Sequence, residues 1–289
     1  MKKGVYKKLS AAKNLPRRLK NDSKVQGGRV VVVAGSPGMW GAGVLAAQAA
    51  SRCGAGYIYL LESTRKNFFK HPDFLTSTET QLKKISANSA ILGPGYRKPR
   101  SIKSWIQHWK TKKQKNVVLD AEALNWLAEN PQHVLDKSWV LTPHEGEMAR
   151  LLHKTRQWVH GHRQEAVLMA QKKWQCIVVL KGPSTLVADG HHLYSIDAGN
   201  PSLGKAGSGD VLSGMIAGFL AQRLATSSPT ESVCAAVFVH GWMADQWMQS
   251  QKDVLSLRPT DLIENLPTTL ASLRKVPGAQ KPRSAKNDK

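Results

Sequence analysis

Short apolar runs alternate along the chain with longer segments in which apolar residues recur at helical spacing. The apolar runs predict strands at residues 30–34, 57–61, 90–92, 117–120, 139–142 and 177–181, followed by a hairpin at 184–188 and 193–196. The longer segments predict helices at residues 42–53, 101–109, 163–174, 210–224, 230–249 and 260–270, with two more through Leu124 and from near Glu145. The strand runs are apolar throughout, which indicates strands buried on both faces. This pattern predicts an α/β fold with a mostly parallel central sheet and helices on both sides.

Six loops at the ends of these elements contain most of the residues from which a binding site can be built. In a parallel sheet, ligands bind at the carboxyl ends of the strands. Each loop follows a predicted strand or opens a predicted helix, so we expect the loops to meet at one edge of the sheet. They read GSPGMWGA from residue 35, GPG from 93, DAEAL from 120, TPHEGE from 142, KGPST from 181 and NPSLGKAGSGD from 200.

The strongest local signal is GKAGSGD at residues 204–210, which opens a predicted helix. Glycines allow a tight turn, and the bare N–H groups and dipole of a helix start attract an anion. Asp210 would then lie beside a bound phosphate, where a carboxylate can act as the base in a phosphoryl transfer. The same spacing also fits an aspartate that only caps the helix. It is not a Walker A loop, because no G-K-[ST] follows the glycines.

Residues 142–147 combine a histidine with two carboxylates. His144 and Glu147 are three residues apart and would share one helical face. Glu147 could hold Mg²⁺ through water, and His144 could contact a ligand. The alternative is a capping arrangement of Thr142 and Glu145, which the spacing by itself favours.

Three further segments contain candidate contacts. In the segment from Lys181 to Thr185, the lysine and threonine could reach a phosphate or the edge of a nucleotide, although its Gly-Pro also suits an ordinary turn. The Gly93-Pro94-Gly95 turn allows the backbone to approach a ligand closely. Asp120 ends a predicted strand and could be a polar anchor.

The composition supports a folded domain and narrows its class. Hydrophobic residues make up 41% of the 289 residues and charged residues 21%, which allows a sizeable core and excludes wholesale disorder. No apolar run approaches the roughly 20 residues of a membrane helix, and no secretory signal is recognisable. The three cysteines are far apart without a C-x-x-C motif, which argues against zinc and a disulfide framework and favours a reducing cytoplasm.

Much of the net charge of +22 lies at the two ends of the chain. Residues 1–29 carry +9 and residues 274–289 carry +5, which leaves +8 for the remaining 244. We therefore expect a solvated basic arm at 1–14, a domain at 15–275 and a basic disordered tail at 276–289. Residues 65–115 contain thirteen Lys or Arg and two acidic residues, with few aromatics between them. That pattern favours a solvated basic face over a nucleic-acid groove.

Taken together, these motifs resemble the NAD(P)HX dehydratase family, a branch of the ribokinase-like superfamily. The resemblance runs in order along residues 15 to 270. It begins with Leu15-Pro16-x-Arg18 and RVVVVAGS and continues through SRCGAGYIYLLE, LGPG, LDAEAL, LTPHEGE, LKGPST, GNP and AGSGDVLSG. It implies a ribokinase-like three-layer α/β/α sandwich with a mostly parallel central sheet. Ser208 stands where the family usually has threonine, which keeps the hydroxyl.

The resemblance implies an ADP-dependent (S)-NAD(P)H-hydrate dehydratase. Such a lyase repairs NADH and NADPH that carry water added across a nicotinamide ring double bond, and converts (6S)-NADHX and (6S)-NADPHX back. The donor would be ADP, giving AMP and phosphate, or ATP. The implied route is phosphorylation of the ring hydroxyl and then elimination of phosphate, with Mg²⁺ as cofactor. The choice of donor and the preference between NADHX and NADPHX stay open.

The resemblance also implies roles for individual residues. The base that activates the hydroxyl would be Asp210. The anion hole would consist of Gly207, Ser208 and Gly209. The nucleotide would be bound by Lys181, Gly182, Pro183, Ser184, Thr185 and Gly209. The hydrated dinucleotide would contact Ala42, Gly95, His144 and Asp210. Glu147 would help to organise Mg²⁺ indirectly.

Partners follow from the same resemblance, and two alternatives remain. Because 14 residues precede the match, we expect an epimerase on a separate chain. We also expect a homo-oligomer, with a tetramer as the first candidate, and no membrane or nucleic-acid partner.

One alternative function is a small-molecule kinase of the same fold, which would release a stable phosphorylated product. The TPHEGE and KGPST segments argue against it. The other is a basic nucleotide- or nucleic-acid-binding protein without catalysis, which the basic ends favour and Asp210 disfavours.

Overall fold

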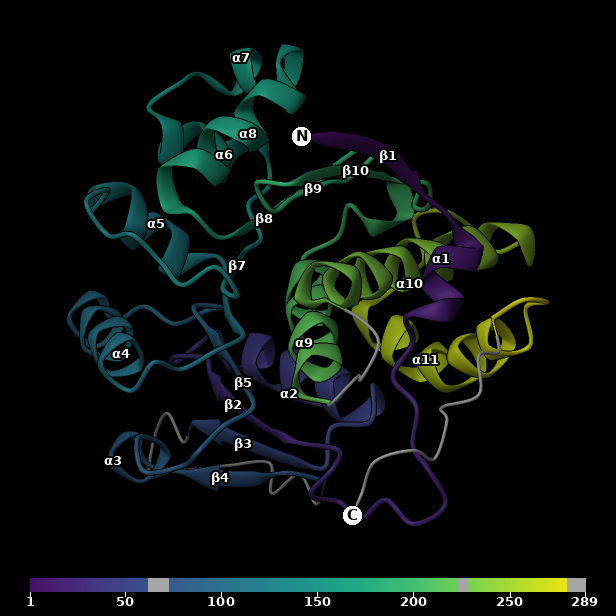
Figure 1. The fold of residues 1–289 in the computed structure, drawn as a ribbon, viewed down its shortest axis with the longest axis horizontal. Coiled ribbons are helices and arrows are strands. Elements are labelled where there is room, and N and C mark those ends of the chain that lie inside the picture. The colour runs from purple at the N-terminus through teal and green to yellow at the C-terminus, as the bar shows by residue number, and fades with distance from the viewer. Residues whose placement is uncertain (62–72, 223–227, 280–289) are drawn as a thin grey trace.

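The structure, a computed structural model, describes residues 1–61, 73–222 and 228–279 (Figure 1). Within them, ten strands form one sheet in the order β1-β10-β9-β8-β7-β6-β5-β2-β3-β4. Neighbouring strands are parallel, except that β9 runs antiparallel to β8 and β10. The strands are β1 (Lys2–Tyr6), β2 (Arg29–Val33), β3 (Tyr57–Leu61), β4 (Leu75–Ser77), β5 (Ser89–Leu92), β6 (Val117–Leu119), β7 (Val140–Leu141), β8 (Ile177–Leu180), β9 (Leu186–Ala188) and β10 (His192–Ile196).

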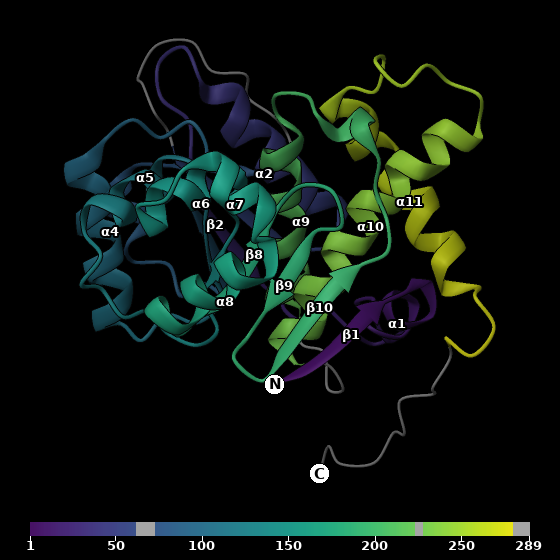
Figure 2. The same cartoon turned by 90° about the horizontal axis from the view of Figure 1, so that it is seen from above.

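Helices cover both faces of this sheet, which gives three layers (Figures 1 and 2). One face is covered by α1 (Lys8–Lys13), α2 (Trp40–Arg52), α9 (Ser208–Ala221), α10 (Pro229–Gln249) and α11 (Pro259–Arg274). The other is covered by α4 (Pro99–Thr111), α5 (Glu122–Glu129), α6 (Glu145–Leu152), α7 (Arg156–Gly161) and α8 (Arg163–Trp174). The short α3 (Glu79–Leu82) follows β4, and a 3-10 turn, η1 (Pro201–Leu203), precedes α9.

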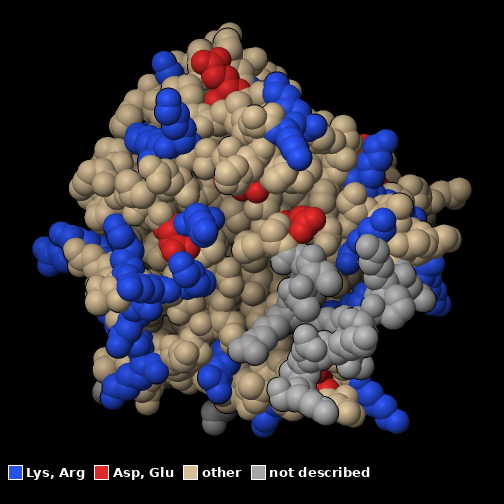
Figure 3. Space-filling view, in the orientation of Figure 1, with Lys and Arg blue, Asp and Glu red and all other residues tan. Residues whose placement is uncertain are grey.

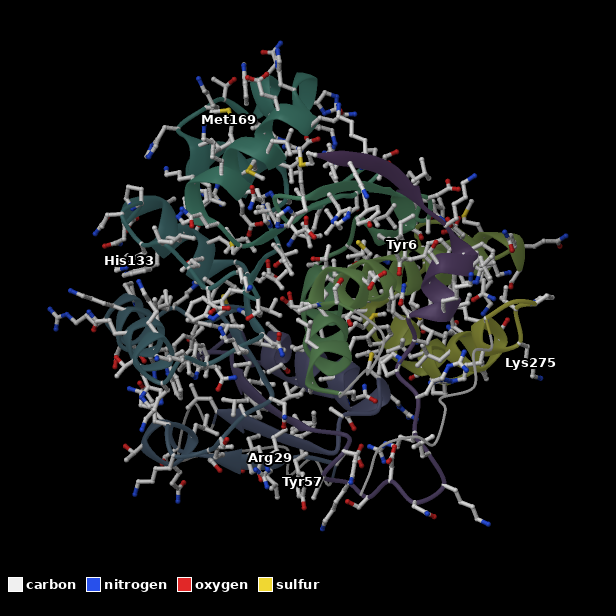
Figure 4. All side chains as sticks on the ribbon, in the orientation of Figure 1. Tyr6, Arg29, Tyr57, His133, Met169 and Lys275 are labelled. Atoms are coloured by element: carbon white, nitrogen blue, oxygen red, sulfur yellow. The ribbon has the colours of Figure 1, made fainter. Side chains whose placement is uncertain are left out.

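The central strands are buried on both faces, as their apolar runs predict. In β2, Val30 and Val32 belong to one core cluster, and Val31 and Val33 to the other. Successive side chains of a strand point to opposite faces, so a strand between two layers of helices needs apolar residues at every position. At the start of the same strand, Arg29 lies over the ring of Tyr57, 5.8 Å from its centroid (Figure 4).

Helices α2 and α9 pack closely because glycines on α9 leave room for the α2 backbone. A Cβ on Gly214 would lie 2.2 Å from the carbonyl oxygen of Ala46, and one on Gly218 would lie 2.9 Å from that of Ala50. Only hydrogen fits at these two positions. This contact holds the first turn of α9 in place relative to the sheet.

The N-terminal residues belong to the folded domain, so the expectation of a solvated arm is wrong for residues 2–13. Strand β1 pairs in parallel with β10, and α1 packs on the core (Figure 2). Tyr6, labelled in Figure 4, is 3% exposed. Its ring makes an edge contact with that of Tyr194. The charge count missed this because the lysines face solvent, while Tyr6, Ala11 and Ala12 face inward.

Several smaller differences concern element boundaries. The sequence analysis missed β4, α3 and α7, which are short. Helix α9 begins at Ser208, and residues 223–224 of the helix expected there lie outside the described residues, as does the tail from 280 onward. Lys and Arg side chains gather over α3 and α4 (Figure 3), which agrees with the predicted basic face where that stretch is described. None of the helices in the described ranges combines the length and the apolar character of a membrane span.

Candidate active site

Polar side chains meet at the carboxyl ends of three neighbouring strands, opposite the first turn of α9. Asp120 follows β6, Lys181 follows β8, and the strand between them, β7, leads into α6, which carries Glu147. These are the strand ends at which a parallel sheet binds its ligands. The loops that the sequence analysis singled out therefore supply the polar groups at this edge.

Asp120 accepts three hydrogen bonds at this edge. It is 2% exposed, and Lys181 Nζ donates to its Oδ1 at 3.0 Å. Ser213 Oγ, on α9, donates to its Oδ2 at 2.7 Å, and the backbone N–H of Ala121 donates to Oδ1 at 2.9 Å. Three elements, β6, β8 and α9, thus meet on one carboxylate.

Lys181 also faces a second carboxylate, Glu147, which is 6% exposed. The distance from Lys181 Nζ to Glu147 Oε2 is 3.7 Å. Burial works against the charged ammonium, but Asp120 and Glu147 outweigh it and raise the pKa of Lys181. Burial raises the pKa of Glu147, and Lys181 opposes this in part. The lysine is a permanent cation held between two buried carboxylates.

Asp210, the third residue of α9, is poised to accept a proton near neutral pH. Burial and then the charge of Asp120 raise its pKa to about 7, while Lys181 lowers it. The N-cap residue of α9 is Gly207, and Asp210 lies within the first turn of the helix as its one acidic residue. A carboxylate with a pKa raised by burial and a like charge is typical of functional sites.

The first turn of α9 presents free backbone donors next to this carboxylate. Gly207 has φ +93°, which favours glycine, and it turns the chain into the helix. Among the described residues, the N–H groups of Gly207, Gly209 and Asp210 have no acceptor, whereas that of Ser208 donates to Lys205 O at 3.1 Å. Bare N–H groups at a helix start form an anion site.

His240 on α10 supports the same turn from behind. Its Nε2 lies 3.1 Å from Ser208 O and 3.2 Å from Ser208 Oγ. Burial lowers its pKa to about 4, so the ring is neutral at neutral pH. The sequence analysis did not single out His240, Ser213 or Asp245, whose carboxylate accepts from Gly199 N at 2.8 Å before the turn. None of these lies in a glycine-rich loop, and they reach the site only through packing.

His144 and Glu147 form the cap of α6. His144 Nδ1 accepts from the backbone N–H groups of Gly146 at 2.9 Å and Glu147 at 3.2 Å, and Glu147 Oε2 accepts from His144 N at 2.8 Å. The capping arrangement is therefore real, but His144 is the cap instead of Thr142. Burial and then Lys181 lower the pKa of His144, which keeps its ring neutral. Its half-exposed imidazole can still meet a ligand.

The KGPST segment divides into two parts. Lys181 turns inward to the carboxylates, whereas Gly182, Pro183 and Ser184 are exposed. Arg163 holds the strand end from beneath, since it donates to Leu180 O at 3.3 Å and pairs with Glu145 at 2.7 Å. The Thr185 hydroxyl donates to Gly182 O at 3.1 Å, which closes the turn.

Ala42, in the first turn of α2, lies against Gly95, in the loop after β5. A Cβ on Gly95 would lie 3.1 Å from Ala42 Cβ and 2.7 Å from Met39 O. Gly35 N donates to Pro94 O at 2.8 Å, which ties the loop after β2 to the loop after β5. A Cβ on Gly207 would lie 2.8 Å from Leu45 Cδ1, so this pair adjoins the first turn of α9 through α2.

The described part of the chain contains no group of three or more His, Cys, Asp or Glu side chains that could hold a metal ion. The Lys181 ammonium lies between Asp120 and Glu147, so those two carboxylates already face a cation. The arrangement suits a divalent ion bound mainly by ligand phosphates, because Mg²⁺ commonly takes one or two carboxylates and keeps its waters.

A family model described as NAD(P)H-hydrate dehydratase matches residues 30–268. The chain belongs to the NAD(P)H-hydrate dehydratase family. It is 36% identical over 265 residues to the bifunctional NAD(P)H-hydrate repair enzyme Nnr of Coxiella burnetii, which covers 87% of this chain and 52% of that protein. It is also 36% identical over 239 residues to the ADP-dependent (S)-NAD(P)H-hydrate dehydratase of Neisseria meningitidis. That match covers 79% of this chain and 80% of the relative. The chain spans about half the length of the first curated relatives it matches.

Solved structures confirm the ribokinase-like fold. A ribokinase-like superfamily protein from Enterococcus faecalis superposes with a TM-score of 0.83 over 94% of this chain and 96% of its own, at 24% identity. An ADP/ATP-dependent NAD(P)H-hydrate dehydratase from Bacillus subtilis, co-crystallised with ATP/Mg²⁺, superposes with a TM-score of 0.82 at 25% identity. The superposition covers 93% of this chain and 98% of that protein. The family and the fold implied by the sequence motifs are both confirmed.

Proposed function

We propose that this member of the family dehydrates the S epimer of NADHX and NADPHX to NADH and NADPH at the expense of ADP or ATP. The observation that carries the proposal is Asp210: a partly buried carboxylate with a pKa of about 7, beside the free N–H groups of the α9 start. A base and an anion site are thereby next to each other. That is what transfer of a phosphoryl group to a hydroxyl requires.

The chemistry explains why a nucleotide is consumed. Hydroxide is a poor leaving group and phosphate a good one. In the first step the ring hydroxyl loses its proton to Asp210 while its oxygen forms a bond to the terminal phosphorus. The bond from that phosphorus to the bridging oxygen breaks, which releases AMP from ADP, or ADP from ATP. In the second step the C–O bond breaks and phosphate leaves with its electron pair. Loss of a proton from the neighbouring ring carbon restores the double bond, and no oxidant is needed.

The first turn of α9 supports the anion-hole role of Gly207 and Gly209, because their N–H groups have no acceptor among the described residues. Ser208 differs, since its N–H is already bonded to Lys205 O, and its hydroxyl lies near His240. We assign Ser208 to the shape of the turn. Preorganised donors aimed at developing charge are worth about 10²–10³-fold in rate.

Binding of the two substrates is proposed on either side of this turn. The exposed Gly182, Pro183 and Ser184 of the KGPST turn, with Thr185 and Gly209, would hold the nucleotide. The packed pair of Ala42 and Gly95, together with His144, would hold the hydrated dinucleotide. The Bacillus subtilis relative that was co-crystallised with ATP/Mg²⁺ supports nucleotide binding by this fold. Both ADP and ATP remain in the proposal.

Magnesium would act with the nucleotide and not in a protein cage. Oε2 of Glu147 is engaged by His144 N, and Oε1 remains to hold a water of the ion. When bound, Mg²⁺ would neutralise phosphate charge. Glu147 caps α6, and it would also hold a water of the ion when Mg²⁺ is bound.

The wider setting is also a proposal. Cys53, Cys176 and Cys234 are buried free thiols, which fits a reducing cytoplasm. The Coxiella burnetii relative is named a bifunctional repair enzyme, which supports a second repair activity that works together with this one. We propose that this partner activity is the epimerase. We propose that the working unit runs from β1 through α11 and assembles as a homo-oligomer, with light scattering in solution as the check on a tetramer.

The decisive test follows the ultraviolet absorbance of reduced nicotinamide. Hydrated NADH and Mg²⁺ are mixed with ADP or with ATP, and wild type is compared with Asp210→Asn. We expect absorbance to rise with at least one donor and the substitution to abolish the rise. A folded wild-type protein that gives no rise with either donor would refute the dehydratase. Accumulation of a phosphorylated hydrate without NADH would indicate a kinase of the same fold instead.

A further inference from the structure

Lys181 and Asp120 form an ion pair that nucleotide binding by the KGPST loop does not require. Lys181 was expected to reach the nucleotide with the rest of its loop, yet its side chain is 19% exposed and turns toward the carboxylates. In the proposed function Asp120 contacts neither substrate. It nevertheless accepts three hydrogen bonds, from β8, from α9 and from its own loop.

The direction of Lys181 points to the anion site. A Cβ built on Gly209 would lie 3.3 Å from Lys181 Nζ and 4.0 Å from Asp120 Oδ2. The ammonium therefore lies against the second residue of α9, whose N–H is one of the free donors. A phosphoryl group held by these donors would lie beside the ammonium.

We propose that Asp120 is a positioning residue that holds the Lys181 ammonium at the mouth of the α9 anion hole, and that Lys181 stabilises the phosphoryl group during its transfer. This inference rests on the proposed function. Lys181 is then a catalytic residue, and the part of the nucleotide that it meets is the phosphoryl group being transferred. Bond making and breaking are those already described, and the lysine stays protonated throughout.

The charges around the pair explain why the lysine needs to be held. Asp120, Glu147 and Asp210 all interact with Lys181, so an untethered ammonium could move toward Glu147. Ser213 prevents this by fixing Asp120 from α9, one turn after Asp210. The same Asp120 charge raises the pKa of Asp210 and so keeps the base close to neutrality.

The experiment is a double-mutant cycle on the full chain with Asp120→Asn, Lys181→Met and both together. Asparagine keeps the size of the side chain and removes its charge. Each single change is expected to lower kcat about 100-fold with little change in KM, as for loss of one preorganised electrostatic group. The double variant is expected to fall no further, because both changes remove the same interaction.

A pH profile separates positioning from mere support of the fold. Without the Asp120 charge, the pKa of Asp210 falls, so the acid limb of kcat/KM should move to lower pH in Asp120→Asn. Asp136→Asn is the matched control, since it removes an aspartate–lysine pair with Lys115 on the surface. It should leave both kcat and the profile unchanged.

Three results would overturn the inference: a folded Asp120→Asn variant with wild-type kcat, an effect confined to KM, or losses that add in the double variant. If Asp120→Asn does not fold, Lys181→Ala with added small primary amines decides, since rescue of kcat supports the inference and its absence refutes it. An inactive wild type contradicts the proposed function itself. An active wild type with a fully active Asp120→Asn contradicts the inference alone.

Discussion

The tight crossing of α2 and α9 provides a sharp test of how the active site is held. The change is Gly214→Ala, which adds one methyl group at the contact. Its carbon would lie 2.2 Å from Ala46 O and 2.8 Å from Ala49 Cβ. An ordinary carbon–oxygen contact is about 3.3 Å or longer, so the two helices must separate by about 1 Å.

The expected magnitude combines two opposing effects. Overpacking of a core typically costs about 1–3 kcal/mol, and the upper end applies here because the obstructing atom is backbone. Alanine in place of glycine in a helix recovers about 1 kcal/mol. The free energy of unfolding should therefore fall by about 2 kcal/mol. Displacing the start of α9 by about 1 Å from Lys181 should also lower kcat by roughly 100-fold.

The assay is urea unfolding followed by circular dichroism, together with turnover of the hydrate. Gly161→Ala is the matched control, because a Cβ there meets nothing within 4 Å. That control should keep full turnover and gain about 0.5 kcal/mol or less. A Gly214→Ala protein as stable and as active as wild type would refute the argument that this crossing positions the site.

Two further predictions test the base and the N-terminal strand. Because the Asp210 pKa is raised to about 7, kcat/KM should fall as pH drops below about 7. The folded state holds that proton more tightly than the unfolded chain, so the stability it contributes is present below the unfolded pKa of 3.8 and is lost as pH rises through 7. Asp210→Asn should therefore melt above wild type at alkaline pH, and an equal melting temperature there would contradict this. Tyr6→Ala should reduce the free energy of unfolding by about 3 kcal/mol, because it empties a buried site, while Val5→Ala on the exposed side should change it little; equal effects would show that β1 does not pack as described.

The architecture could be predicted because it depends on local patterns. Apolar runs such as 30–34 have the composition of strands between two layers of helices, and the glycines before Asp210 specify a tight entry into a helix. The elements that the sequence analysis missed are short or consist largely of charged residues. Strand β1 is five residues long and rich in lysine. Tyr6 is its one buried side chain, and that burial depends on the helices packed on it.

The sequence predicted which loops form the candidate site, but not which side chains contact one another within it. The motifs identified Asp210, Lys181, His144 and Glu147, and all four lie at one edge of the sheet. Their spacing did not show that His144 is the cap of α6, or that Lys181 turns away from its own loop. A helix cap and a side-chain direction depend on backbone angles and neighbours that residue spacing does not specify.

The sequence alone determined the layers, the binding edge and the candidate base, since these follow from periodicity and from residues adjacent in the chain. Only the tertiary structure decided the electrostatics of the site. Asp120 meets Lys181 across 61 residues and Ser213 across 93, and the pKa of Asp210 depends on burial among them. Charges act through space, and distances through space are settled only when the sheet and α9 have packed.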